Sequence, residues 1–255
     1  WNTAANWTPN GVPSAGSRVT IDASVTVTAS GNAINFYELT LGDTPGTFAP
    51  ILLVSTAINS AVGMIVHKNA TFTQNVNQAL IFSGDVSFLQ GAVLNHSLIG
   101  TTPQSRSVNL DVAGTFTMQA GATAAVSSLG FNGGAVNGGS GIVIGGGGGV
   151  GNSASSAGGS GAGHGGIGGA AGINAGGVTS DSLTDPALGG SGGGGGDNAT
   201  GGVGGVGGGV VRVHAGTIVF DGIILATGAV GGGGGLPSAT RGAGGGGAGG
   251  RVKLS

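Results

Sequence analysis

Glycine dominates the second half of this chain and restricts what that half can fold into. Of the 63 glycines in 255 residues, 52 follow residue 129. The densest blocks are residues 145–151, 158–177, 189–209 and 231–250. Glycine has no side chain to bury and loses more backbone freedom on ordering than any other residue. These blocks cannot form an ordinary hydrophobic core, so any order in them must come from backbone hydrogen bonds.

An aliphatic residue recurs at every third position of these blocks, where a flexible linker would carry polar filler. Ile167 occupies this position in residues 165–170, and Val203 and Val206 do so in residues 201–206. Only glycine lets neighbouring backbones approach closely enough to bond to each other, and polyproline II has three residues per turn. The pattern therefore predicts polyproline II segments packed side by side as a bundle. The alternative is that the blocks are mobile loops.

The first half has the pattern of many short β-strands joined by tight turns. β-Branched residues are common in it, strong helix formers are scarce, and Gly or Asn recurs between short apolar runs. The predicted strands are residues 19–28, 34–41, 51–55, 64–66, 70–73, 79–82, 86–89, 93–94, 108–112, 115–118 and 123–126. Residues 59–60, Asn-Ser, are expected to form a turn.

A weak internal repeat indicates that these strands stack in coils. Residues 83–88, 113–118 and 215–220 share a glycine at the second position and apolar residues at the fourth and sixth. The first two of these glycines, Gly84 and Gly114, are 30 residues apart. A coil of about that length would place equivalent residues about 4.8 Å apart. We therefore predict an all-β fold, a parallel β-solenoid or β-helix with the glycine-rich polyproline II segments packed as a bundle.

The change in composition near residue 130 divides the chain into two regions. Residues 1–129 are predicted to be the β-solenoid scaffold, and residues 130–255 the glycine-rich region. Strand-like patterns return within the second region at residues 209–228 and 251–255. We therefore expect one continuous structural unit from which glycine segments emerge as excursions.

The N-terminal segment resembles the opening of secreted bacterial surface β-helix domains, such as those of adhesins. The resemblance rests on Asn6-Trp7, on Gly11-Val12-Pro13 and on the strand-like Arg18-Val19-Thr20-Ile21 followed by Val25-Thr26-Val27. It implies a parallel β-helix at a cell surface. Because the chain also begins with Trp1 and is poor in charge, we expect an exported protein, extracellular or at the cell surface.

The small number of charges argues against several classes of partner. Only 7 Lys and Arg and 9 Asp and Glu occur, with a net charge of −2. There is no basic patch for nucleic acid, and so little charge favours self-association. Residues 44–67 contain no Asp, Glu, Lys or Arg, but polar residues interrupt them and no membrane span is expected. Cysteine is absent, which excludes disulfides and thiolate metal sites.

No group of residues indicates catalysis, and we expect no enzyme, no cofactor and no metal. His67, His96, His164 and His214 are scattered, and each is expected to be satisfied by backbone groups. The carboxylates are spread about one to a coil, whereas β-helix hydrolases and lyases cluster them. Residues 192–200 match a calcium nonapeptide in part and once, although calcium rolls need successive copies.

The two ends of the chain are the candidate functional regions. Trp1, Trp7 and Val12 are expected at the N-terminal end of the coils, and the alternating strand Arg251, Val252, Lys253, Leu254 at the other. In this strand, Val252 and Leu254 would point into a neighbour while Arg251 and Lys253 face water, after a flexible tether over residues 242–250.

An uncovered coil end exposes backbone groups that pair readily with another chain. We therefore expect a structural subunit of an extracellular filament or surface fibre, a homopolymer that assembles head-to-tail by strand or coil pairing. The alternative is a monomeric or surface-anchored adhesin that binds glycans, ice or a cell surface. Threonine pairs at residues 26 and 28, 71 and 73, and 115 and 117 would order water if they shared one face.

Overall fold

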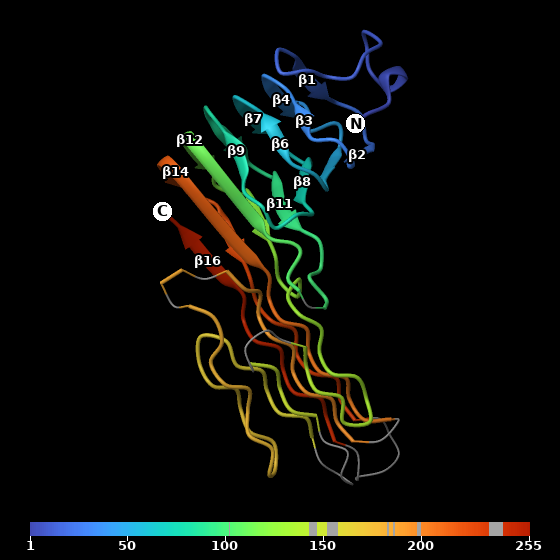
Figure 1. The fold of residues 1–255 in the computed structure, drawn as a ribbon, viewed down its shortest axis with the longest axis vertical. Coiled ribbons are helices and arrows are strands. Elements are labelled where there is room, and N and C mark those ends of the chain that lie inside the picture. Colours follow the sequence, from blue (N-terminus) through green and yellow to red (C-terminus); the bar gives the residue numbers. More distant parts are fainter. Residues whose placement is uncertain are drawn as a thin grey trace.

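The fold is almost entirely β in the part of the chain that the structure describes. The structure is a computed structural model that describes residues 1–101, 103–142, 147–151, 158–182, 184–185, 187–197, 200–234 and 242–255. These residues form sixteen strands and a 3-10 turn, η1 (Ala4–Asn6), with no α-helix. Figure 1 shows an elongated molecule with the strands at one end and the glycine-rich segments running side by side at the other.

The first sheet is parallel throughout and contains strands from both regions of the sequence. Its order is β1-β4-β7-β10-β12-β14-β16, and β9 pairs with β12 beside this path. The bounds are β1 (Arg18–Ile21), β4 (Glu38–Leu41), β7 (Gly63–Val66), β9 (Leu80–Phe82), β10 (Val86–Phe88), β12 (Val108–Met118), β14 (Val210–Phe220) and β16 (Arg251–Leu254). The strands that return after the glycine excursions thus extend the same sheet.

The second sheet is also parallel and has the order β15-β13-β11-β8-β5-β2, and a third contains β3 and β6. The bounds are β2 (Thr26–Ala29), β3 (Ile34–Asn35), β5 (Ile51–Val54), β6 (Ile58–Ser60), β8 (Thr71–Gln74), β11 (Val93–His96), β13 (Thr123–Ala125) and β15 (Ile223–Leu225). The expected turn at residues 59–60 is wrong, since β6 runs through it and pairs with β3. The strand continues to Ser60, and the next strand, β7, begins at Gly63.

The first strands follow one another over the sheets in a repeating order, and the strands that the repeat aligns are paired in parallel. β1, β2 and β3 are followed by β4, β5 and β6 on the same three sheets. Val86 is in register with Phe116, and Phe116 with Ile218, as the alignment of the repeats requires. The spacing of 30 residues holds for one step alone. Earlier steps are shorter, at 20, 25 and 22 residues, because loop length varies without affecting the strand register.

The two long strands, β12 and β14, each span two successive strand positions of the first sheet. The first half of β12 pairs with β9, where Leu110 is opposite Leu80, and its second half pairs with β10. β14 follows β12 along both halves, with a register shift between Val112 and Thr115. The two predicted strands at 108–112 and 115–118 are therefore one strand in the structure.

The hydrophobic core lies between the sheets and is formed by alternate residues of the strands. Its largest fully buried side chains include Phe36, Phe72, Phe82, Phe88 and Phe116. The rings of Phe88 and Phe116, on neighbouring strands, have centroids 6.0 Å apart. Burying such side chains contributes about 1.5–3 kcal/mol each, which is the stability that the glycine half lacks.

The glycine-rich segments are ordered by hydrogen bonds between their backbones, as the every-third-residue pattern suggested. Residues 189–197 are buried throughout and lie at the centre. Successive amides there donate to different neighbours: Gly193 to Gly205, Gly194 to Ser160 and Gly195 to Gly139. A backbone with three residues per turn points successive amides in three different directions, so that each amide can reach a different neighbour.

Residues 242–250 belong to this hydrogen-bonded set. Amides in the segment donate to Gly194, Ala229 and Ser191 among others, so the segment is no free tether. Its exposure also repeats every third residue: residues 242, 245 and 248 are buried and 243, 246 and 249 are exposed. The expectation of a flexible tether is therefore wrong, because six of the nine amides in residues 242–250 donate hydrogen bonds to other segments.

The central position of Gly193 leaves no room for a side chain, so we predict that Gly193→Ala destabilises the protein. A Cβ there would clash with the carbonyl oxygen of Gly245. Forcing the backbones apart costs about 1–3 kcal/mol by analogy with overpacked cores, and thermal unfolding measures the loss. Gly166→Ala is the matched control, because nothing lies within 4 Å of a Cβ at that position. Equal melting temperatures for the two variants would contradict this account.

Candidate functional site: the two ends of the stacked sheets

The titratable residues are spread over the described ranges, where no three His, Asp or Glu side chains lie close enough to hold a metal ion. Asp85 has a structural role, because its carboxylate accepts a hydrogen bond from the Thr115 amide of the next coil. In the partial calcium motif, Asn198 and Ala199 lie outside the described residues, and the Asp197 carboxylate accepts from the Gly242 amide.

At one end of the sheets, several strands have a partner on one side alone. β16 pairs with Val210–Val213, the first half of β14. Residues 217–220 of β14 pair with β12 alone among the described strands, and β15 pairs with β13 alone. We call residues 217–220, β15 and β16 the tail edge. An edge that no described strand covers has backbone N–H and C=O groups that can pair with a further strand.

Apolar side chains that continue the core are uncovered at the tail edge. Val252 and Leu254 lie in register with the buried Val211 and Val213, but are 44% and 37% exposed. Phe220 and Ile224 pack against the core and are half-buried. This end of the core therefore exposes apolar surface that a further strand could cover.

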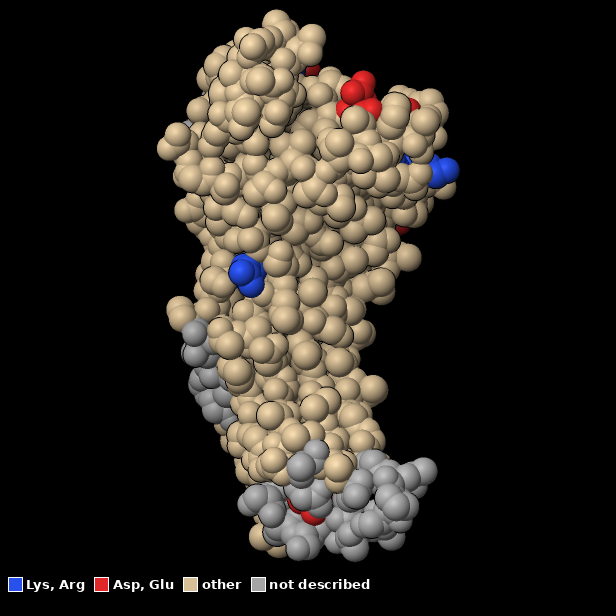
Figure 2. All heavy atoms as spheres, turned by 90° about the vertical axis from the view of Figure 1, so that its right-hand side faces the viewer, with Lys and Arg blue, Asp and Glu red and all other residues tan. Residues whose placement is uncertain are grey.

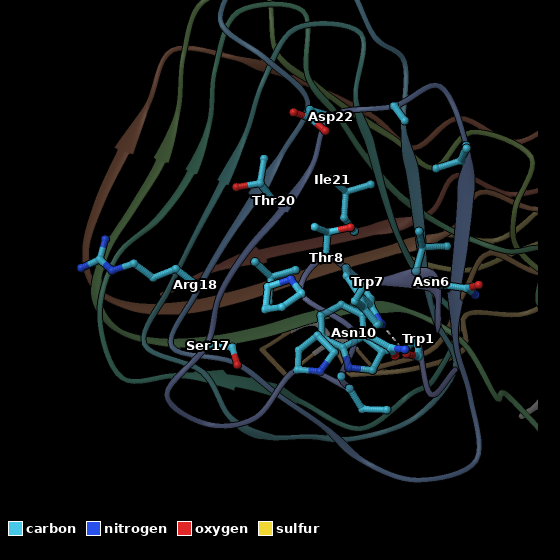
Figure 3. Close-up of a pocket in the computed structure, with 18 of the residues that line it drawn as sticks. Trp1, Asn6, Trp7, Thr8, Asn10, Ser17, Arg18, Thr20, Ile21 and Asp22 are labelled. Atoms are coloured by element: carbon cyan, nitrogen blue, oxygen red, sulfur yellow. Dashed lines mark hydrogen bonds between the residues drawn. The ribbon is translucent and has the colours of Figure 1, made fainter. Parts of the chain in front are cut away.

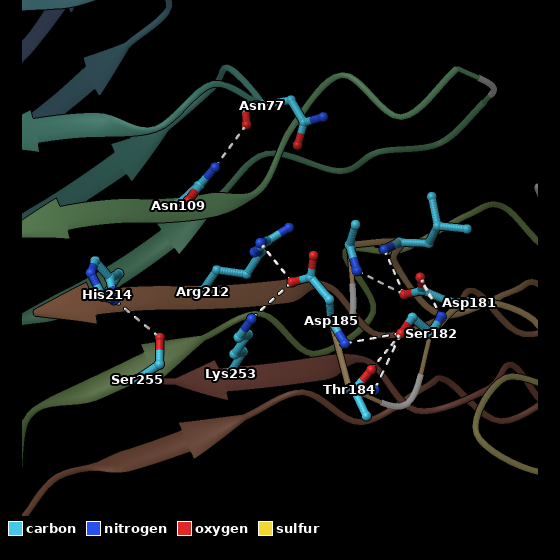
Figure 4. Close-up of polar contacts among 12 residues, drawn as sticks. Asn77, Asn109, Asp181, Ser182, Thr184, Asp185, Arg212, His214, Lys253 and Ser255 are labelled. Carbon is cyan, nitrogen blue, oxygen red and sulfur yellow. Dashed lines mark hydrogen bonds and ion pairs between the residues drawn. The ribbon is translucent and has the colours of Figure 1, made fainter.

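Lys253 contacts a neighbouring segment, which corrects the expectation that it faces water. Its Nζ lies 2.9 Å from Oδ1 of Asp185, and Arg212 of β14 reaches the same oxygen at 3.0 Å (Figure 4). The hydrogen bond from Lys253, together with the charges of Arg212 and Lys253, lowers the pKa of Asp185. One carboxylate thus bridges two cations, Arg212 and Lys253, which are in register on the paired strands.

Arg251 is also half-buried rather than directed to water. Its Nε donates to Nε2 of His164 at 3.2 Å and its Nη2 to the carbonyl of Ser180 at 3.2 Å. The segment carrying these partners is shaped by Asp181, whose carboxylate accepts from the amides of residues 182, 187 and 188.

The opposite end carries a groove beneath the N-terminal segment, which we call the head groove. It has a volume of about 890 Å³. Its lining consists of residues 17–23, which contain β1, residues 25–28, which include most of β2, and residues of the N-terminal segment such as Trp7 and Val12 (Figure 3). β1 pairs with β4 alone and β2 with β5 alone among the described strands. The floor of the groove is therefore a strand edge.

The two tryptophans cover part of this end of the core. Trp1 is 7% exposed, and its ring meets that of Trp7 edge-on at 5.1 Å between centroids. The Trp7 indole N–H donates to the Trp1 carbonyl at 2.8 Å, and the Trp1 ammonium donates to the Thr28 carbonyl. Val12 is 45% exposed. Of the three N-terminal candidates, Trp1 is thus engaged within the chain while Val12 is accessible.

The predicted threonine pairs divide between two sheets. Residues 26 and 28 lie on β2 and residues 71 and 73 on β8, both in the second sheet, whereas Thr115 and Thr117 lie on β12 of the first sheet. On the second sheet, one outward column runs in register across six strands. It consists of Thr26, Ile51, Thr71, Val93, Thr123 and Ile223.

Charge is sparse over the surface, as the composition requires. On the face drawn in Figure 2, a few isolated acidic and basic side chains interrupt an otherwise uncharged surface. Arg18 and Glu38 form an exposed pair at 2.5 Å on neighbouring strands. No helix long and apolar enough to cross a membrane occurs in the described residues.

Comparison with known proteins yields no relative: no protein-family model, curated protein or solved structure matches this chain.

Because Asp185 neutralises Arg212 and Lys253, we predict that Asp185→Asn loosens β16. The two cations would then repel each other across the paired strands, and amide hydrogen exchange of residues 251–254 should become faster at pH 7. Below the lowered pKa of Asp185 the wild-type chain loses the same pair, so the difference between the two proteins should disappear. Asp22→Asn, at the opposite end, is the control. Unchanged exchange in residues 251–254 would rule out this role of Asp185.

Proposed function

We propose that this chain is a structural subunit of an extracellular filament, assembled head-to-tail through the ends of its sheets. In this proposal the stacked strands form a parallel β-solenoid, and the glycine-rich segments form a polyproline II bundle attached to its side. The observation that carries the proposal is the open tail edge. It combines unpaired strand edges with uncovered core residues at the position where a further coil would continue the stack.

The order of the strands supports a second copy as the occupant of this edge. β16 lies at the position that precedes the β1 position in every coil, since β9 there is followed by β10. A following subunit would therefore contribute its β1 and β2 next, beside residues 217–220 and β15. Val19 and Ile21, the inward residues of β1, would then cover Ile218 and Phe220. Such contacts between unlike ends produce an open filament.

The head must open for this pairing to occur. The β1 edge faces the groove, but Trp1 and Asn2 already bond to the carbonyls of Thr28 and Ser30 at the β2 edge. The proposal therefore requires residues 1–2 to move away from β2, after which Trp7 and Val12 would border the joint. The low charge and the resemblance to surface β-helix domains support an extracellular location.

If the tail edge joins subunits, its substitution should abolish assembly without unfolding the chain. We predict that wild-type protein forms filaments at micromolar concentration, and that deletion of residues 251–255 or the double change Val252→Asp and Leu254→Asp leaves folded monomers. A buried carboxylate at the joint would be strongly unfavourable. Sedimentation velocity and electron microscopy measure the assembly.

The control is Val230→Asp, because Val230 is 89% exposed on a glycine-rich segment away from either end. This variant should assemble as the wild type does. A wild-type chain that stays monomeric at high concentration would refute the proposal, as would filaments formed by the truncated chain.

A second candidate function, ice binding, is favoured by the outward column on the second sheet. The column alternates threonine with aliphatic β-branched residues and contains no charge. Its side chains recur about every 4.8 Å across the strands. A flat, regular array of hydroxyl and methyl groups is a surface on which water can be ordered.

This candidate predicts thermal hysteresis by the monomer, which Thr71→Lys at the centre of the column should abolish. A lysine there interrupts the array with a strongly hydrated charge. Thr40→Lys is the matched control, because Thr40 lies on β4 of the first sheet. Equal hysteresis in the two variants, or none in the wild type, would count against ice binding.

A further inference from the structure

Both strands that return from the glycine excursions begin at a contact with a buried histidine. His96 lies at the end of β11, and its Nε2 is 3.0 Å from the amide nitrogen of Val210, the first residue of β14. Its Nδ1 is 2.7 Å from the Ser97 carbonyl oxygen. A carbonyl can accept only, so Nδ1 carries the proton and Nε2 accepts from Val210. His96 is thus a neutral acceptor for the first amide of β14.

His164 has the same arrangement with the first residue of β16. Its Nδ1 lies 2.9 Å from the Gly249 carbonyl oxygen, and its Nε2 accepts from Nε of Arg251 at 3.2 Å. Arginine is a donor only, so Nε2 of His164 must be unprotonated. The two contacts come from unrelated parts of the sequence, yet they use the same tautomer in the same role.

Burial keeps both rings neutral. His96 is 1% exposed, and burial, against a smaller opposing effect of the Ser97 carbonyl and with a small contribution from Arg106, lowers its pKa to about 4. Burial also lowers the pKa of His164, which is 4% exposed. The Gly249 carbonyl opposes that shift.

Two charged side chains face His164: Arg251 of β16 lowers its pKa further, and Asp181 raises it. The Asp181 carboxylate lies 3.8 Å from Nε2 of His164 and already accepts the amides of Ala187 and Leu188. Asp185, Arg212 and Lys253 form the neighbouring cluster described above. Asp181 is therefore the one anion positioned to compensate a charge on this ring, and only in part.

Protonation would replace each acceptor by a donor. At His96, the new N–H would point at the Val210 N–H, in a site with no carboxylate among the residues that influence its pKa. At His164, a cation would face the guanidinium of Arg251. In both places a buried group loses its partner, which costs more than the hydrogen bond alone contributed.

We propose that His96 and His164 form an acid-sensitive latch, and that acidification releases both β14 and β16. In this latch His96 holds the start of β14 to the end of β11, and His164 holds the start of β16 to the glycine-rich segment of residues 158–177. The sign follows from linkage. The pKa of each histidine is lower in the folded chain than the value of about 6.5 in the unfolded chain. Their stabilising effect is therefore complete above about pH 6.5 and is lost as the pH falls towards the folded-state pKa. The latch does not depend on the proposed assembly.

Histidine NMR titration of the intact chain is the first test and needs no variant. The rings of His96 and His164 should titrate below 6.5. The protection factors of the amides in residues 210–215 and 251–254 should fall between pH 7 and 4.5, while those of β7 and β10 remain high. Chemical denaturation should show the ratio of folded to unfolded chain falling on the order of 100-fold between pH 6.5 and 4. Titration of all four rings near 6.5 would overturn the proposal.

Substitution of His96 and of His164 tests which ring causes the loss of amide protection at low pH. Gln retains a neutral acceptor that cannot be protonated in this range, so His164→Gln and His96→Gln should each reduce the loss of protection at low pH. His67→Gln is the control and should show the wild-type profile, since His67 is only half-buried. If a folded His164→Gln chain released residues 251–254 at the same pH as the wild type, the assignment of β16 to His164 would be wrong. Should His96→Gln fail to fold, the NMR titration of His96 decides its part.

Discussion

Backbone hydrogen bonding between adjacent segments is the interaction on which the whole molecule depends. In the first half it joins parallel strands, and side chains such as Phe88 and Phe116 fill the interior between the sheets. In the second half the same donors and acceptors pair without side chains, as between Gly193 and Gly205. The halves differ in what stabilises them: burial of apolar surface in one, and close approach of backbones that only glycine permits in the other.

The junction between the strands and the glycine-rich segments contains several of the few charged residues of this chain. Asp185 pairs with Arg212 and Lys253, and His164 pairs with Arg251, all within reach of the returning strands β14 and β16. Glycine segments offer no side chains to set the position at which a strand re-enters a sheet. Specific hydrogen bonds and ion pairs supply that position, and they make the junction sensitive to charge and to pH.

The proposed functions rest on the two kinds of surface that this architecture leaves uncovered. A stack of coils has two ends, and the tail edge exposes Val252 and Leu254 together with unpaired backbone groups. It also has sides, and the second sheet presents a regular uncharged column around Thr71. An end favours addition of a further coil, whereas a side favours binding to a flat surface. The first requires self-association and the second does not, so they are separable by experiment.

The sequence by itself determined the β class, nearly all strand positions, the pairing of the repeats at Val86, Phe116 and Ile218, and the period of three in the glycine blocks. These follow from local alternation and from the geometry of one segment. Tertiary structure alone decided the partners of Arg251 and Lys253, the exposure of β15 at the tail edge, and the acceptor role of His96 towards Val210. The contacts of Arg251, Lys253 and His96 join residues 68 to 114 positions apart across glycine excursions, which have no side-chain pattern from which their path could be read.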